Sequence, residues 1–293
     1  MNWREALSAK KPIITDGACG TELQKRGWTG GEASEKATLD RPDAVREIAE
    51  SYVSAGSDIV LTNTFGGTRI KLAKAGLDSE TARINRSGAE LSRQAAGEGR
   101  LVLGSMGPTG EILEPLGGLA AEAAEEAYSE QAAALAEGGV DGLVVETMSD
   151  LGEALAALRG AKMATDLPVV VCMAFEKGAK GCATMMGVRP EQAAGEFEAA
   201  GADVVGANCG VTIAAMVEVV RELRSATAKP IWAKPNAGKP ELVDGATVYR
   251  ETVEEFIRHF PDLVDAGAHF VGGCCGTTPE HIRLLAHERD GLA

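Results

Sequence analysis

The stretch SAGSDIV at residues 54–60 recurs in altered form at three later places: EGGVDGLVV at 137–145, AAGADVV at 199–205 and DAGAHFV at 265–271. In each copy a small residue and a glycine precede a short run of apolar residues. This pattern is typical of a helix that ends at a glycine and leads into a buried strand. The sequence therefore predicts one helix-to-strand unit that is repeated along the chain.

The same alternation extends over the whole chain. Strands are predicted at 13–16, 58–64, 101–105, 142–146, 168–174, 204–207, 230–234 and 269–272, and helices at 42–55, 79–96, 121–137, 151–164, 190–200, 213–226, 252–266 and 279–287. Eight such units, with strands apolar enough to be covered on both faces, match an α/β fold of the closed (β/α)8 TIM-barrel type. Neither GxGxxG nor GxxxxGK[ST] occurs, which disfavours the competing open nucleotide-binding sheet. No linker-like tract divides the chain, so one domain over residues 1–293 is predicted.

The charge balance limits the classes of partner. The chain has 29 Lys and Arg residues against 43 Asp and Glu residues, a formal net charge of -14. Such a surface repels phosphate backbones and anionic lipids, so neither nucleic acid nor a membrane is an expected partner. The longest apolar run, 167–175, is too short to span a bilayer, and the N-terminus has charges where a signal peptide needs an apolar core. We therefore expect a cytoplasmic protein.

In a barrel of this type the active site lies at the carboxyl ends of the strands. Polar and sulfur-bearing residues occur at these predicted ends, with Gly17 beside the first of them: Asp16, Cys19, Thr21, Asn63, Thr64, Glu146, Thr147, Asn208, Cys209, Lys234, Asn236, Cys274 and Cys275. The sixth and eighth strands are next-but-one neighbours, so thiolates from their ends can reach a common point. Adjacent residues on a regular strand point to opposite faces, so Cys274 and Cys275 can share a metal only if the chain turns sharply, which the glycines of GGCCG permit.

Three thiolates supply three of the four ligands of a tetrahedral zinc and leave one position open, which is the pattern of a catalytic site. The alternatives for Cys274 and Cys275 are a strained vicinal disulfide or two unrelated core thiols. Cys172, inside an apolar strand, is expected to be an inert core residue. Cys19 and Cys182 lie in glycine-rich loops, and the sequence leaves their role open.

Two carboxylates remain as candidates for binding a substrate. Glu146 ends an apolar strand, where a carboxylate is costly unless a cationic or hydrogen-bonding group meets it, and this favours a functional role. Asp16 precedes Gly17, and a plain turn or cap residue explains it about as well as a functional one.

With these residues in view, the sequence resembles the homocysteine S-methyltransferase family, which includes a domain of cobalamin-dependent methionine synthase and betaine–homocysteine methyltransferase. The matching motifs are ITDGACGTELQKRG at 14–27, AGSDIVLTNTFGGT at 55–68, GSMGPTG at 104–110, GLVVETMSD at 142–150, GANCG at 206–210, KPNAGKP at 234–240 and VGGCCGTTPEHI at 271–282. The double-cysteine motif together with the cysteine of GANCG is the most specific part of this resemblance.

The resemblance implies a zinc-dependent methyl transfer to the thiol of L-homocysteine, which gives methionine. It assigns Zn²⁺ to Cys209, Cys274 and Cys275, with the homocysteine thiol as the fourth ligand. It assigns the substrate amino group to Glu146.

Further substrate-binding residues are expected around these. By the same resemblance Asp16 and Gly17 border the amino-acid end of homocysteine, and Asn236 lies beside the metal, where it can fill the fourth position before substrate binds. Asn63, at the end of the second predicted strand, is expected to line the same site. Zinc coordination deprotonates a thiol whose free pKa is about 8.5, so the metal would create the nucleophile.

The methyl donor is less clearly specified. Betaine-using relatives have a Tyr after the TF motif of the second strand and a C-terminal extension, whereas this chain reads TFGGTRIKL at 64–72 and ends shortly after TTP. We therefore expect methylcobalamin on a separate corrinoid protein, since the chain is too short to include cobalamin or folate domains. The alternatives are betaine or another small onium donor, such as S-methylmethionine or a dimethylsulfonio compound, which Trp28 could face. A different thiol acceptor, or a zinc- or redox-sensing binding module, also remains open.

Overall fold

Eight parallel strands form the centre of the computed structural model, which describes residues 1–28, 33–243 and 246–292. They are β1 (Ile13–Ile14), β2 (Ile59–Leu61), β3 (Leu101–Met106), β4 (Gly142–Met148), β5 (Val169–Met173), β8 (Val204–Thr212), β9 (Ile231–Asn236) and β12 (Ala268–Val271). Their order is β1-β12-β9-β8-β5-β4-β3-β2, and a parallel bridge between Thr15 and Ile59 joins the two ends. The sheet is therefore closed, and the predicted TIM barrel is confirmed.

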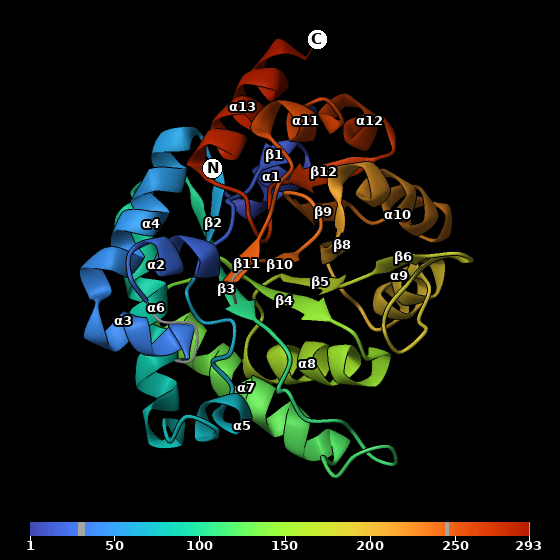
Figure 1. Cartoon of the computed structure of the whole chain (residues 1–293). Coiled ribbons are helices and arrows are strands. Elements are labelled where there is room, and N and C mark those ends of the chain that lie inside the picture. The colour runs from blue at the N-terminus through green and yellow to red at the C-terminus, as the bar shows by residue number, and fades with distance from the viewer. Residues whose placement is uncertain (29–32, 244–245, 293) are drawn as a thin grey trace.

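The long helices surround the strands (Figure 1). They are α4 (Pro42–Ala55), α6 (Thr81–Ala96), α7 (Ala121–Glu137), α8 (Leu151–Ala164), α9 (Pro190–Ala199), α10 (Ile213–Ala226) and α13 (Pro279–Gly291). The single helix predicted at 252–266 is wrong, because two helices, α11 (Val253–Ile257) and α12 (Phe260–Asp265), occupy this segment. Pro261 lies in the first turn of α12, where its missing N–H is tolerated, whereas the interior of one long helix would lose a hydrogen bond there. Within the described residues, every helix falls short of the length and hydrophobicity that a membrane span requires.

Several short elements were not predicted. They are α1 (Trp3–Leu7), α2 (Gly20–Lys25), η1 (Ser34–Lys36), α3 (Ala37–Asp40), α5 (Arg69–Ala73), η2 (Asp78–Glu80) and two antiparallel hairpins, β6 (Glu176–Gly178) with β7 (Gly181–Ala183) and β10 (Glu241–Val243) with β11 (Ala246–Val248). Each is too short for a helical or alternating apolar pattern to stand out. Apart from α1, they lie in the connections that leave the carboxyl ends of the strands or lead into the following helices.

The interior of the barrel is filled with apolar side chains and closed at its amino-terminal end. Cys172 is fully buried in this interior cluster together with Trp232 and Phe270, as predicted for an inert core thiol. Helix α1 covers the cluster: the ring of Trp3 stacks on Phe270 with centroids 5.7 Å apart and planes inclined by 10°. The opening of the barrel is therefore at the carboxyl ends of the strands.

Above the apolar interior the strands carry polar side chains on the same inward face. Side chains two positions apart on a strand lie on the same face. Glu146 therefore shares the inward face of β4 with the interior residue Val144, and Lys234 shares that of β9 with the interior residue Trp232. Both polar side chains are buried, with exposed fractions of 8% for Glu146 and 3% for Lys234. A polar layer therefore lies between the apolar core and the mouth of the barrel.

Candidate active site

Three cysteines from two strand ends meet at the mouth. Cys209 lies near the end of β8, and Cys274 and Cys275 follow β12. Their sulfur atoms all lie within 4.8 Å of one another, with 4.0 Å between the Sγ atoms of Cys209 and Cys275. All three thiols are free, so the structure has no vicinal disulfide at Cys274 and Cys275. We call Cys209, Cys274 and Cys275 the three-sulfur cluster.

The chain turns after β12 in the way that shared coordination requires. Gly276 has a φ of 81°, in the left-handed region that favours glycine, and a Cβ there would lie 2.5 Å from Tyr249. The backbone N–H of Cys274 donates to Pro235 O at 2.8 Å, and the carbonyl of Cys275 accepts from Ala237 N at 3.0 Å. These bonds fix both cysteines against the end of β9.

The three-sulfur cluster fits a tetrahedral zinc. Zn–S bonds of about 2.3 Å at tetrahedral angles place two sulfur atoms about 3.8 Å apart, so the observed separations need only a small contraction. The buried Asn236 is 2% exposed, and its Oδ1 has no hydrogen-bond partner among the described residues. An unpaired buried oxygen of this kind is costly unless something binds it, and metal coordination would satisfy it.

The thiols of the cluster also share charge. Hydrogen bonds from Cys274 and then Cys275 lower the pKa of Cys209 to about 3. The same hydrogen bond with Cys209 raises the pKa of Cys274 well above its usual value and that of Cys275 to about 11. A negative charge in the cluster is therefore favoured on Cys209 over Cys274 and Cys275.

A cavity of about 360 Å³ opens beside the cluster. Most of the predicted site residues line it: Asp16, Gly17, Cys19, Asn63, Glu146, Cys209, Cys274 and Cys275. Asn236 does not line the cavity. The structure therefore brings the two candidate carboxylates and the three-sulfur cluster to one concave site.

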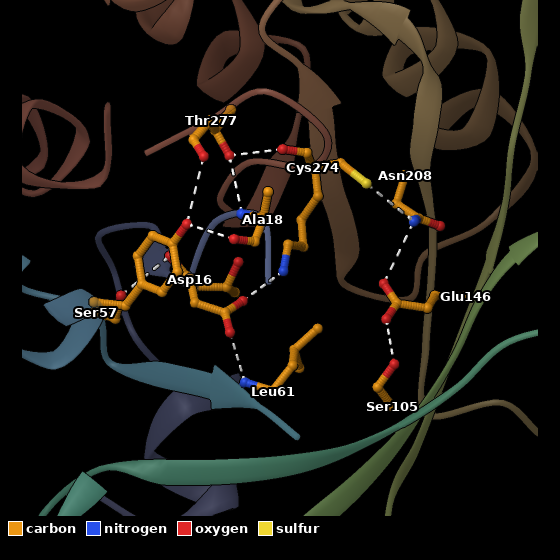
Figure 2. A network of polar contacts seen from close by, with 12 residues as sticks. Asp16, Ala18, Ser57, Leu61, Ser105, Glu146, Asn208, Cys274 and Thr277 are labelled. Carbon is orange, nitrogen blue, oxygen red and sulfur yellow. Dashed lines mark hydrogen bonds and ion pairs between the residues drawn. The ribbon is translucent and has the colours of Figure 1, made fainter. Parts of the chain in front are cut away.

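Glu146 is held by hydrogen bonds on both oxygens. Its Oε1 accepts from Ser105 Oγ at 2.5 Å, and its Oε2 accepts from Asn208 Nδ2 at 3.3 Å (Figure 2). Burial raises the pKa of Glu146, while the charge of Lys234 and the Ser105 bond act in the opposite direction. A cationic group that entered the cavity would offset the cost of burying this carboxylate.

Asp16 is part of a buried ion pair rather than a helix cap or a plain turn. Its Oδ1 lies 2.5 Å from Nζ of Lys234, and its Oδ2 accepts from Leu61 N at 2.7 Å. A Cβ on Gly17 would lie 2.8 Å from Thr277 Oγ1 and from the ring of Tyr52, so a larger residue at position 17 would clash with both side chains. The sequence placed Lys234 at a predicted strand end but gave it no role, although a lysine two positions after an interior tryptophan was a visible signal.

Asn208, within the GANCG motif, is a second residue at a predicted strand end to which the sequence gave no role. Its side chain is fully buried, and its Oδ1 accepts from Thr147 N at 2.7 Å while its Nδ2 donates to Thr147 Oγ1 at 2.7 Å. The same Nδ2 lies 3.8 Å from Cys274 Sγ. Thr147 and Cys209 both have a φ of 61°, which non-glycine residues rarely adopt. Asn208 therefore links the strained end of β4 to the three-sulfur cluster.

We expect Asn208→Ala to lower the free energy of unfolding by about 1–3 kcal/mol, because Glu146 and Thr147 would lose buried hydrogen bonds. Urea unfolding followed by circular dichroism measures this change. Gln94→Ala, on the exposed side of α6, is the control and should leave the transition in place. Superimposable unfolding curves for Asn208→Ala and the unmodified chain would show that Asn208 does not stabilise the site.

The remaining candidates lie apart from the cluster. Cys19 lines the cavity, but its Sγ lies 3.5 Å from Asn63 Oδ1, and burial together with Asp16 raises its pKa to about 12. Cys182 is buried in β7. Trp28 is also buried, with the Arg41 guanidinium 5.8 Å above its ring, and does not line the cavity.

A known protein family matches most of this chain. The family described as "Homocysteine S-methyltransferase" matches residues 13–289. Methionine synthases of Mycobacterium leprae (strain TN) and Mycobacterium tuberculosis (strain ATCC 25618 / H37Rv) are each 33% identical over 298 residues, with 95% of this chain but 24% of the relative covered. The chain thus spans about a quarter of the length of these relatives.

Solved structures show the same fold. The metallated form of the homocysteine methyltransferase MmuM from Escherichia coli superposes with a TM-score of 0.81 at 23% identity, over 97% of this chain and 99% of that chain. Its apo form gives a TM-score of 0.77 at 24% identity, over 98% of both chains.

Proposed function

The chain belongs to the homocysteine S-methyltransferase family, and on that premise we propose that it transfers a methyl group to the thiol of L-homocysteine and releases methionine. The observation that carries this proposal is the shared cavity, in which a three-sulfur cluster suited to zinc and the buried carboxylate of Glu146 face one space. A thiol amino acid offers the matching groups, a sulfur for the metal and an ammonium for the carboxylate.

In this proposal Cys209, Cys274 and Cys275 hold the zinc. When bound, zinc would keep the homocysteine sulfur deprotonated near neutral pH, where a free thiol with a pKa of about 8.5 is mostly protonated. The three cysteine thiolates leave the site negatively charged, which keeps an added sulfur electron-rich. Asn236 would satisfy the fourth position before the substrate arrives, through its otherwise unpaired Oδ1.

The other residues bind and orient the amino acid. Glu146 accepts hydrogen bonds from the substrate ammonium, and Ser105 holds the carboxylate in the required rotamer. The loop at Asp16 and Gly17 borders the amino-acid end, and Asn63 lines the adjoining wall. Methyl transfer is an in-line displacement, so the main contribution of these residues is to hold the sulfur in the attacking position.

For the donor, we propose methylcobalamin carried by a separate corrinoid protein. The connections that leave the carboxyl ends of the strands expose large apolar side chains around the mouth, as a docking surface would: Phe65, Ile112, Leu116, Met185, Met186 and Leu242. The residue that favoured a small onium donor, Trp28, is packed under Arg41 instead of lining the cavity. All six cysteines are free thiols, which suits the reducing cytoplasm that we propose as the site of action.

The test is methionine formation by the zinc-loaded protein with homocysteine and, in parallel, methylcobalamin, glycine betaine, S-methylmethionine or dimethylsulfoniopropionate. Methionine from methylcobalamin alone is the expected result. Turnover with an onium donor alone would retain homocysteine as the methyl acceptor and identify the onium compound, not methylcobalamin, as the methyl donor. Absence of methionine with every donor, together with zinc coordination that homocysteine leaves unchanged, would overturn the proposal in favour of a zinc- or redox-sensing module.

A further inference from the structure

Lys234 places a buried positive charge in the cavity. It is 3% exposed, and among the described residues that line the cavity it is the one with a cationic side chain. The neighbouring carboxylates are negative: Asp16 Oδ1 lies 2.5 Å from Nζ, and the charge of Glu146 also stabilises the ammonium against the cost of burial.

The ammonium of Lys234 has N–H donors that make no recorded hydrogen bond within the described residues. A lysine ammonium can donate three hydrogen bonds, and the structure records one for Lys234 within the described residues, to Asp16. Among the described residues, Asp16 is the one carboxylate recorded within 4.0 Å of Nζ, so Glu146 is not an ion-pair partner of Lys234. Further N–H groups of Lys234 are therefore left for an acceptor that a ligand brings into the cavity.

An amino acid brings such an acceptor. Its carboxylate loses water on entering a buried cavity, and this is unfavourable unless a cationic donor replaces the lost hydrogen bonds. Its ammonium has the same need for an anion, which Glu146 supplies. A zwitterion adds one charge of each sign, so both of its ends can be paired without changing the net charge of the site.

We propose that Lys234, oriented by Asp16, binds the α-carboxylate of the acceptor amino acid while Glu146 binds its ammonium. This assignment rests on the proposed function, and it adds the residue that binds the α-carboxylate of the substrate. It predicts that the cavity selects thiols that carry a carboxylate, and that this selection can be separated from selection for the amino group.

Two analogues of homocysteine separate the two ends. 4-Mercaptobutyrate keeps the thiol and carboxylate and lacks the amino group, whereas 3-aminopropane-1-thiol keeps the thiol and amino group and lacks the carboxylate. Binding of each to the zinc-loaded protein is measured by isothermal titration calorimetry, so no methyl donor is involved. Lys234→Met should weaken homocysteine and 4-mercaptobutyrate about 10- to 100-fold and leave 3-aminopropane-1-thiol unchanged.

Glu146→Gln is the matched control, and it should show the reverse pattern by weakening homocysteine and 3-aminopropane-1-thiol. If Lys234→Met alone does not fold because Asp16 loses its cation, the double variant Lys234→Met/Asp16→Asn removes both charges, and it should show the same selectivity as Lys234→Met. Equal weakening of all three ligands, or of none, would overturn the assignment and leave Lys234 as a structural partner of Asp16.

Failure of this assignment is distinguishable from failure of the proposed function. Carboxylate-selective binding that depends on Lys234 would support the assignment even if no donor yields methionine. Methionine formation with ligand affinities that Lys234→Met leaves unchanged would retain the function and refute the assignment.

Discussion

Cys275→Ala is expected to remove zinc and methyl transfer together while the barrel stays folded. The variant leaves two of the three sulfur ligands. Cys274 is held by the bond from its N–H to Pro235 O and Cys209 by its place in β8, and neither depends on the Cys275 side chain. We expect methionine formation to fall by about a thousandfold or more, because metal activation contributes several kcal/mol to such a barrier. Zinc content, far-UV circular dichroism and methionine formation are measured on one preparation.

Cys209→Ala and Cys274→Ala should behave in the same way as Cys275→Ala. Cys182→Ala is the matched control, since this buried cysteine lies in β7 outside the cavity, and it should keep its zinc. Full zinc content in any one of the three cluster variants would exclude that cysteine from the ligand set.

Glu146→Ala is expected to raise the homocysteine KM about a hundredfold or more. The carboxylate is buried and aimed into the cavity, and removing one partner of a buried charge pair costs about 3–5 kcal/mol. The zinc ligands are untouched, so zinc content should stay at the level of the unmodified protein. Initial rates over a range of homocysteine concentrations, at saturating donor, separate KM from kcat.

Glu176→Ala provides the control for the loss of one negative charge, because Glu176 is exposed at the β6–β7 hairpin. Its KM should match that of the unmodified protein. A KM for Glu146→Ala equal to that of this control would remove Glu146 from the substrate site.

The barrel could be predicted because its signal is repeated. Four copies of the small-residue, glycine and apolar-strand pattern, such as 54–60 and 199–205, mark the start of strands that the structure contains. The short elements could not be predicted in this way. Helix α1 has five residues: a capping box between Asn2 and Glu5 marks its start, but so short a helix also depends on tertiary contact, here the stacking of Trp3 on Phe270 far along the chain.

The candidate site, like the fold, could be predicted from the sequence only in part. That the three cysteines would meet could be predicted, because metal-binding residue types occur at the ends of predicted strands that converge on one face. Lys234 and Asn208 depend on partners across the barrel: Lys234 pairs with Asp16, which is 218 positions away, and Asn208 bonds Thr147, which is 61 positions away. A single sequence does not specify which polar side chains on different strands will meet, because that depends on the register around the closed sheet.

The proposed function requires the thiol of homocysteine to bind zinc at the three-sulfur cluster. X-ray absorption at the zinc edge of the zinc-loaded protein tests it directly, with spectra recorded before and after homocysteine is added. We predict three sulfur ligands and one oxygen or nitrogen ligand before addition and four sulfur ligands afterwards, at about 2.3 Å. Zinc ligands that stay unchanged in protein that has bound homocysteine would show that the homocysteine thiol does not reach the metal.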